Sequence, residues 1–319
     1  RELAFYDDGQ PMPSAQDFWQ EQAQTRVRWS PYTYWVVDEF QGDYINIDSN
    51  GIRFTPNYAT DDSQRIFVFG GSTVWGEGAR DAYTIPSHLA RLLNENETPQ
   101  IVTNFGQTGY VSTQDAIWFQ LQLTQGNVPD IAIFYQGFND TLSAWGQNLT
   151  GITLQENSRL NDTEAGRILR NGQPVLRMPN ESLQQYDLSL ANVENADAET
   201  IAARWFANVE LVNALSSAYD VKVIFVWQPA IMFKSPLTAT EQAIIERWEN
   251  ERAGLFDLYT EVDTIIRQGV QNYANIIIVS DLFVGVEDSI FHDLVHITEI
   301  GNGIVAEALL PDIITHLEN

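Results

Sequence analysis

The chain has 319 residues, of which 44% are hydrophobic and 12% aromatic, and it is long and apolar enough for one large α/β domain or two small ones. Its 43 acidic and 17 basic residues give a formal net charge of −26, so it lacks the basic stripe that nucleic-acid binding requires. The absence of cysteine excludes disulfides, thiolate metal ligands and a cysteine nucleophile. Composition therefore favours a neutral substrate and leaves serine as the residue for covalent catalysis.

No segment reaches the roughly 20 consecutive apolar residues that would span a bilayer, so we expect no membrane span in this chain. The sequence starts at Arg1 without a basic and apolar leader, which is compatible with an export signal or a membrane anchor upstream of residue 1. Together with the acidic surface, this leads us to expect an extracytoplasmic or secreted protein.

Residues 1–64 precede the first strong strand and are rich in Trp, Tyr and Asp. Within them, residues 43–54 carry a Ser-Asn-Gly turn between short apolar segments, which predicts a hairpin. We expect residues 1–64 to form an extension packed on a core domain that covers residues 65–319.

The core domain alternates strand and helix patterns. Near-continuous apolar runs, typical of strands buried on both faces of a parallel sheet, occupy residues 65–69, 130–135, 221–227 and 275–279, with a weaker run at 100–104. Helical periodicity covers residues 85–94, 113–124, 198–218, 240–268 and 301–317, and Ser112 with Asp115 resembles a helix N-cap. This alternation predicts a three-layer α/β/α sandwich with a mainly parallel sheet and functional loops at the carboxyl ends of its strands.

Residues 146–197 are polar and too many for an ordinary connection. They are interpreted either as a cap or lid over the site or as a surface excursion without a catalytic role.

The run Gly70-Gly71-Ser72 follows the first strong strand directly. Glycines permit a tight turn and a close approach, and a serine at the start of a helix can present its hydroxyl at the top of the sheet. Alone, the run is weak evidence of a site and is better explained as a turn and helix cap.

Two further motifs follow strand ends. They are Asn104-Phe105-Gly106-Gln107-Thr108-Gly109 and Gln136-Gly137-Phe138-Asn139-Asp140. Backbone N–H groups at glycines and the amide of an asparagine are suitable donors to the oxyanion that forms during ester hydrolysis. The sequence therefore predicts that three strand ends meet at one polar site.

Asp293 and His296 precede the last helix, and a three-residue separation can place carboxylate and imidazole on the same side of a turn. Of the remaining histidines, His88 and His316 are expected on the surface of helices, and His292 is expected to face away from this pair.

In this order, the four motifs resemble the sequence blocks of the SGNH (GDSL-like) hydrolase superfamily over residues 65–317. Gly71 stands where the family usually has Asp. The resemblance implies a flavodoxin-like fold and ester hydrolysis through an acyl-enzyme, without a metal or organic cofactor. It implies that Ser72 is the nucleophile, that His296 is the base oriented by Asp293, and that Ser72, Gly109 and Asn139 form the oxyanion hole.

Other readings stay open at this point. The α/β-hydrolase elbow is disfavoured, because Val74 replaces its last glycine. An O-acyltransferase acting on a glycan and a non-catalytic protein that retains the fold remain alternatives to an esterase acting on a small-molecule or glycan ester. The aromatic residues beside the motifs are candidates for substrate binding or for the core: Trp75, Tyr110, Phe138 and Trp145.

Overall fold

The computed structural model describes residues 15–60, 63–148, 150–154 and 196–318. At its centre lies a five-stranded parallel sheet. From one edge to the other, its strands are β6 (Ile101–Asn104), β5 (Arg65–Gly70), β7 (Ile131–Gln136), β8 (Lys222–Trp227) and β9 (Ile276–Ile278). This order is that of a doubly wound sheet: the chain runs from β5 to β6 on one side, and then crosses to β7 on the other side of β5.

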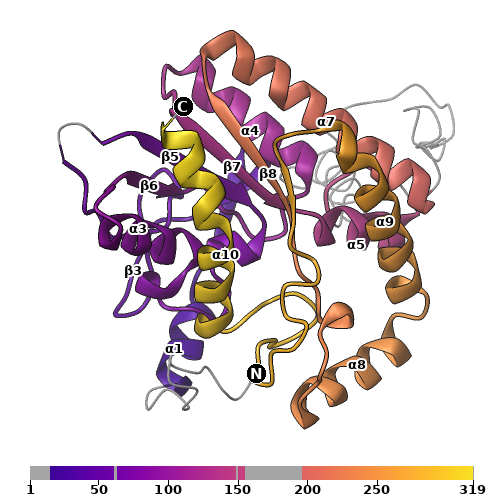
Figure 1. Ribbon diagram of the computed structural model, residues 1–319. Coiled ribbons are helices and arrows are strands. Elements are labelled where there is room, and N and C mark those ends of the chain that lie inside the picture. Colours follow the sequence, from indigo (N-terminus) through magenta and orange to yellow (C-terminus); the bar gives the residue numbers. More distant parts are fainter. Residues whose placement is uncertain (1–14, 61–62, 149, 155–195, 319) are drawn as a thin grey trace, which may run out of the picture.

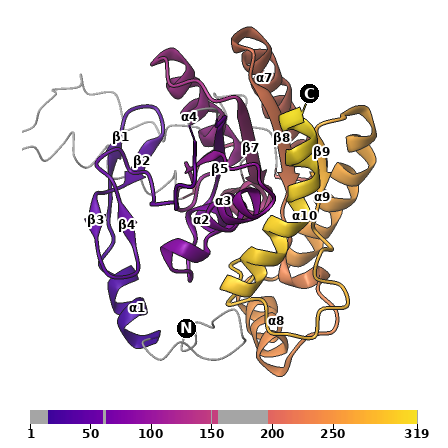
Figure 2. The same cartoon turned by 60° about the vertical axis from the view of Figure 1, so that its left-hand side comes forward.

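Helices cover both faces of this sheet (Figures 1 and 2). One layer consists of α3 (Ile85–Glu95) and α10 (Glu299–Glu318), which pack against each other. The other layer consists of α4 (Ser112–Thr124), α5 (Phe138–Gln147), α7 (Ala198–Tyr219) and α9 (Leu255–Gly269). The predicted three-layer sandwich is confirmed. Within the described ranges, no helix is long and apolar enough to cross a membrane.

The core forms because the central strands are apolar at nearly all of their inner positions, with polar residues at their ends. Aromatic rings stack across them, with centroid separations of 5.0 Å between Phe69 and Phe134 and 5.3 Å between Phe134 and Phe225. Burying such rings on both faces of the sheet is the main favourable term in folding. The result is a rigid platform whose carboxyl edge can hold reactive groups in place.

Two predicted helix boundaries are wrong. The helix expected over 240–268 is two helices, α8 (Ala239–Glu251) and α9, because Gly254 adopts a left-handed conformation with φ of 83°. The N-cap of α4 is Val111 rather than Ser112, whose hydroxyl instead donates to Asp140 at 2.5 Å. A buried acceptor outside the helix therefore overrode the local capping preference.

The N-terminal segment forms α1 (Ala15–Gln22) and two antiparallel ribbons, β1 (Val27–Ser30) with β2 (Tyr34–Val37) and β3 (Phe40–Gln41) with β4 (Asn46–Ile47). In the expected hairpin, Arg53 bridges Ile47 on one side and Asn104 at the end of β6 on the other. Short 3₁₀ helices complete the described elements: η1 (Asp81–Tyr83), η4 (Ile231–Phe233) and η5 (Val270–Asn272). Most of the expected cap or lid, residues 155–195, lies outside the described residues.

Candidate active site

The ends of three neighbouring strands bring the sequence motifs together. Ser72 follows β5, Gly109 follows β6 and Asn139 follows β7, and β5 lies between the other two. This is the switch point of a doubly wound sheet, where the loops leave toward opposite faces and open a crevice between them. The topology therefore places all three residues at one edge.

Ser72 begins α2 (Ser72–Trp75), a single helical turn directly after β5. Gly70 makes this turn possible: its φ is +155°, and a Cβ there would collide with the carbonyl oxygen of Tyr135 in the adjacent strand. Ser72 is 8% exposed, so its hydroxyl lies at the floor of the site rather than on the open surface.

The long loop between β9 and α10 supplies the imidazole. His296 Nε2 lies 2.6 Å from Ser72 Oγ, and His296 Nδ1 lies 2.7 Å from Asp293 Oδ2. The other carboxylate oxygen of Asp293 accepts the backbone N–H groups of Val295 and His296 at 3.1 and 3.0 Å. Burial by itself would raise the pKa of Asp293, but the charge of His296 and these hydrogen bonds hold that pKa well below its usual range. The carboxylate is therefore ionised and fixed toward the ring.

A buried ion pair holds this loop in place, and no motif in the sequence analysis predicted it. Glu241 of α8 accepts the backbone N–H groups of Ile290 and Phe291 at 2.9 and 3.1 Å, just before Asp293. Its other oxygen accepts from Lys234 at 2.8 Å, and neither side chain is exposed. Burial raises the pKa of Glu241, yet the Lys234 and backbone donors outweigh it and lower that pKa. The Thr238-to-Glu241 capping box was the available sequence signal, but it indicated only a helix start.

Asn139 lies beside the serine turn. Its Nδ2 donates to the carbonyl oxygen of Tyr110 at 2.8 Å, and an amide nitrogen has a second hydrogen for another acceptor. Among the described residues, the backbone N–H groups of Ser72 and Gly109 have no hydrogen-bond partner. Asn139 Nδ2 also lies 2.5 Å from the position that a Cβ of Gly71 would occupy, so the amide is next to the residue that precedes Ser72.

The N-terminal segment holds the loop that carries Gly109. The buried Gln107 side chain accepts from Val37 N–H at 2.7 Å and donates to Gly51 O at 2.8 Å, and the Trp35 indole donates to Thr108 O at 2.8 Å. These contacts join β2 and the turn after β4 to the residues directly before Gly109.

Arg53 holds the loop after α2 in a similar way. Its guanidinium donates to the carbonyl oxygens of Trp75, Gly76 and Ala79 at 2.6–2.8 Å and pairs with Asp81 at 2.9 Å. The side chain is fully buried. An arginine in an N-terminal hairpin has no sequence pattern that predicts this long-range role.

Three of the four aromatic candidates lie in the core. Trp75, Tyr110 and Phe138 are at most 2% exposed, so they offer no ring face to a substrate. Trp145 is partly exposed, and its indole donates to Ala253 O at 3.2 Å. His88, expected on the surface, is buried, because α10 covers the face of α3 that carries it.

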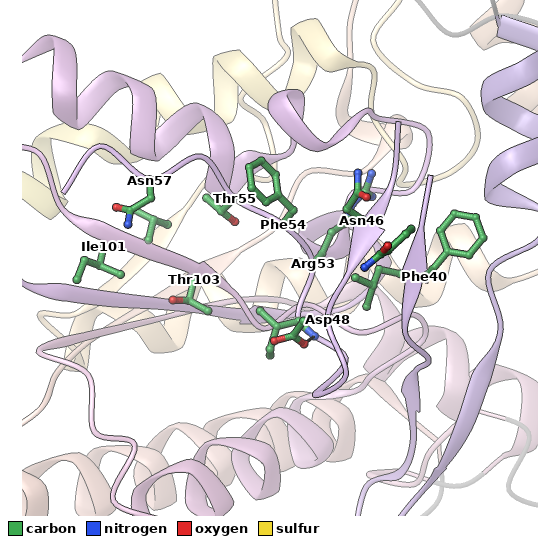
Figure 3. Close-up of a pocket in the computed structure, with 13 residues that line it drawn as sticks. Phe40, Asn46, Asp48, Arg53, Phe54, Thr55, Asn57, Ile101 and Thr103 are labelled. Atoms are coloured by element: carbon green, nitrogen blue, oxygen red, sulfur yellow. Dashed lines mark hydrogen bonds between the residues drawn. The ribbon is translucent and has the colours of Figure 1, made fainter. Parts of the chain in front are cut away.

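A pocket of about 420 Å³ opens elsewhere, between the β3–β4 ribbon and the edge strand β6 (Figure 3). Phe54, Thr55 and Thr103 are among the residues that line it, and Ser72, Asp293 and His296 are not. Arg53 forms part of its wall, so the pocket and the candidate site share one buried guanidinium.

A serine hydroxyl, an imidazole and a carboxylate joined in one hydrogen-bonded series are the arrangement of a serine hydrolase triad. Here that series lies at the carboxyl edge of an α/β/α sandwich.

Neither a family model nor a curated protein matches the sequence. Solved structures are similar in fold: the acetyl xylan esterase AlAXEase has a TM-score of 0.45 and 16% identity, over 78% of this chain and 99% of that chain. A lipolytic protein of the G-D-S-L family from Veillonella parvula DSM 2008 has a TM-score of 0.45 and 14% identity, over 77% of this chain and 96% of that one. The psychrotrophic esterase EstA from Pseudoalteromonas sp. has a TM-score of 0.44 and 12% identity, over 81% and 100% of the two chains.

Proposed function

We propose that the protein is a serine esterase that hydrolyses neutral carboxylic esters through an acyl-enzyme. The observation that supports this most directly is the pair of hydrogen bonds at 2.6 and 2.7 Å that joins Ser72 to His296 and His296 to Asp293. Each group is already within the distance that proton transfer requires.

In the first step, Ser72 Oγ attacks the ester carbonyl carbon while His296 Nε2 takes the hydroxyl proton. The protonated ring then gives that proton to the leaving alcohol as the carbon–oxygen bond of the ester breaks. Water repeats the sequence on the acyl-enzyme and releases the acid. Asp293 keeps the ring oriented and stabilises its positive charge in both steps.

The oxyanion is held by the N–H groups of Ser72 and Gly109 and by the second hydrogen of Asn139 Nδ2. The bond from this amide to Tyr110 O fixes its direction before substrate arrives. An amide oriented in advance supports this proposal, because less reorganisation is then needed when the charge develops.

The surroundings of Gly109 favour short acyl groups. Leu154 Cδ1 and Trp35 Cζ2 lie 3.3 and 3.7 Å from the position that a Cβ of Gly109 would occupy, and these side chains narrow the space beside the oxyanion donors. The net charge of −26 disfavours anionic esters. Acetyl groups on neutral alcohols, including carbohydrates, fit both conditions.

Labelling with a fluorophosphonate probe tests the proposal, since only an activated serine reacts. Wild-type protein should label at one site, Ser72, and should hydrolyse p-nitrophenyl acetate faster than the octanoate. Ser72→Ala should lose labelling and at least roughly 10³-fold in kcat, with Tm nearly unchanged, because one small hydroxyl is removed. A wild-type protein that neither labels nor hydrolyses these esters would favour the non-catalytic alternative.

A further inference from the structure

A second carboxylate lies against the catalytic ring. Glu77 Oε2 is 3.3 Å from His296 Nε2, the nitrogen that also faces Ser72 Oγ. The Glu77 side chain is 17% exposed, so solvent screens this charge only in part. His296 therefore has a carboxylate at each of its two ring nitrogens, and the sequence motifs account for only one of them.

The position of Glu77 is fixed by its neighbours in the chain. Its backbone N–H donates to Ser72 O at 2.9 Å, and Gly76 before it ends α2 in a left-handed conformation with φ of 95°. A Cβ at Gly76 would lie 2.5 Å from the Thr84 side chain, so the backbone is packed tightly at this turn. The turn that displays the serine therefore also displays the glutamate.

Two side chains of the N-terminal segment, the buried Arg53 and the partly buried Gln22, hold the same turn. Arg53 binds the carbonyl oxygens of Trp75 and Gly76, and Gln22 of α1 accepts Gly78 N–H at 2.9 Å. These bonds flank Glu77 on both sides. Because the backbone at Glu77 is already ordered, less conformational entropy is lost when its side chain faces the imidazole.

The charge of His296 decides when Glu77 matters. In the resting site, the neutral ring presents the Nε2 lone pair to the serine hydroxyl, and a nearby carboxylate gains nothing from it. Once the serine proton has moved to Nε2, the ring is a cation with a carboxylate beside each nitrogen. An interaction that strengthens as the reaction proceeds lowers the barrier rather than the ground state.

We propose that Glu77 is a positioning residue for His296. The Glu77 carboxylate stabilises the imidazolium ion that forms on His296 in each acyl-transfer step. This inference rests on the proposed esterase function. Among the described residues, Asp293 in its own loop and Glu77 in the loop after α2 form ion pairs with His296, and Arg252 at the end of α8 acts on Asp293. Removing the Glu77 charge should therefore lower the proton affinity of His296.

The test is the pH dependence of the Glu77→Gln variant. The acid limb of kcat/KM for p-nitrophenyl acetate, and of the labelling rate with a fluorophosphonate, should move to lower pH by about one unit. The rate on the plateau should fall by about 3- to 10-fold, because the ring is then a weaker base. Glu77→Asp, which keeps the charge but retracts it, should give an intermediate shift.

Glu307→Gln is the matched control, since it removes the same charge from an exposed position on α10. Its profile should overlay that of the wild type. An acid limb of Glu77→Gln that coincides with the control would overturn the proposal while leaving the esterase intact. Labelling of Ser72→Ala at the wild-type rate would instead remove the serine mechanism, and the role of Glu77 with it.

If Glu77→Gln is inactive, the proposal can still be tested by a measurement that does not depend on turnover. NMR titration of the His296 ring in the Ser72→Ala background should show the ring losing its proton about one pH unit lower when Glu77 is also replaced by Gln. Identical titrations in the two backgrounds would contradict the proposal.

Discussion

Gly71 has a steric reason to lack a side chain. A Cβ at this position would lie 2.5 Å from Asn139 Nδ2, well inside van der Waals contact. Its backbone is extended, with φ of −78°, so other residues could adopt the conformation without strain. The glycine therefore makes room for the Asn139 amide and is not needed for the turn itself.

Gly71→Asp, which introduces the residue that SGNH hydrolases usually have in the motif that Gly70-Gly71-Ser72 resembles, should therefore impair this protein. The new side chain displaces the Asn139 amide, and we expect kcat to fall by roughly 10- to 10²-fold, as for partial loss of one oxyanion donor. Gly146→Ala in the same helix as Asn139 is the control, because nothing lies within 4 Å of its Cβ position. Equal kcat values for the two variants would show that the amide tolerates displacement.

Asn139→Ala removes the same donor directly. We expect kcat to fall by roughly 10²–10³-fold with little change in KM, because the amide acts on charge that develops only in the transition state. Asn139 also begins an Asn-Asp-Thr glycosylation sequence, and a glycan there would fill the site. Mass spectrometry of the active protein should find Asn139 unmodified; a glycan at full occupancy would rule out this role.

At the scale of elements, predictability follows burial. The strands from residues 65–279 are apparent in the sequence because both of their faces are buried, and every strand expected there is present within a few residues. The ribbons β1–β2 and β3–β4 are short and half exposed, so their pattern is weak. The break at Gly254 depends on one left-handed residue, which a periodicity argument passes over.

The N-terminal ribbon matters because it holds the Gly109 loop. Trp35→Phe keeps the aromatic ring but removes the indole N–H that donates to Thr108 O. A looser loop should lower kcat by about 3- to 10-fold, since loss of one hydrogen bond is worth about 1 kcal/mol. Trp29→Phe in β1, 73% exposed, should leave kcat unchanged. A wild-type kcat for Trp35→Phe would show that the ribbon does not influence catalysis through this hydrogen bond.

The candidate site is only partly readable from the sequence, for a related reason. Ser72, Asp293 and His296 belong to short motifs in which neighbouring residues share one turn, so spacing indicates their geometry. Arg53, Glu241 and Glu77 reach the site from distant or unpatterned positions. Their roles depend on which carbonyls and N–H groups the tertiary fold places beside them, and no local spacing encodes that.

At the scale of the whole molecule, two buried groups in opposite helix layers make folding stability depend on pH in opposite directions. Burial raises the pKa of Asp140 from 3.8 to about 6, although its Ser112 hydrogen bonds oppose the shift. Burial, aided by Arg91, lowers the pKa of His88 from 6.5 to about 4. Asp140 therefore contributes stability below pH 3.8 that is lost as pH rises to about 6. His88 contributes stability above pH 6.5 that is lost as pH falls to about 4.

The free energy of unfolding of Asp140→Asn, relative to that of the wild type, should therefore increase by about 1.4 kcal/mol per pH unit as pH rises from 4 to 6. The free energy of unfolding of His88→Gln, relative to that of the wild type, should increase with a similar slope as pH falls from 6 to 4. The groups lie on different sides of the sheet, so the double variant should recover the wild-type slope. Urea unfolding at half-unit pH steps measures all three; parallel curves would show that neither group is titrating there.

The separation of Ser72 from His296 also has a consequence during synthesis. The two residues are 224 positions apart, and a ribosome adding about 5–20 residues per second makes the serine roughly 10 to 45 s before the histidine. Throughout that interval the nascent chain contains Ser72 without His296. Glu241, which accepts hydrogen bonds from the histidine loop, is also made late. On the proposed mechanism, ester hydrolysis therefore begins only after the ribosome has added His296 and its loop has folded against Ser72.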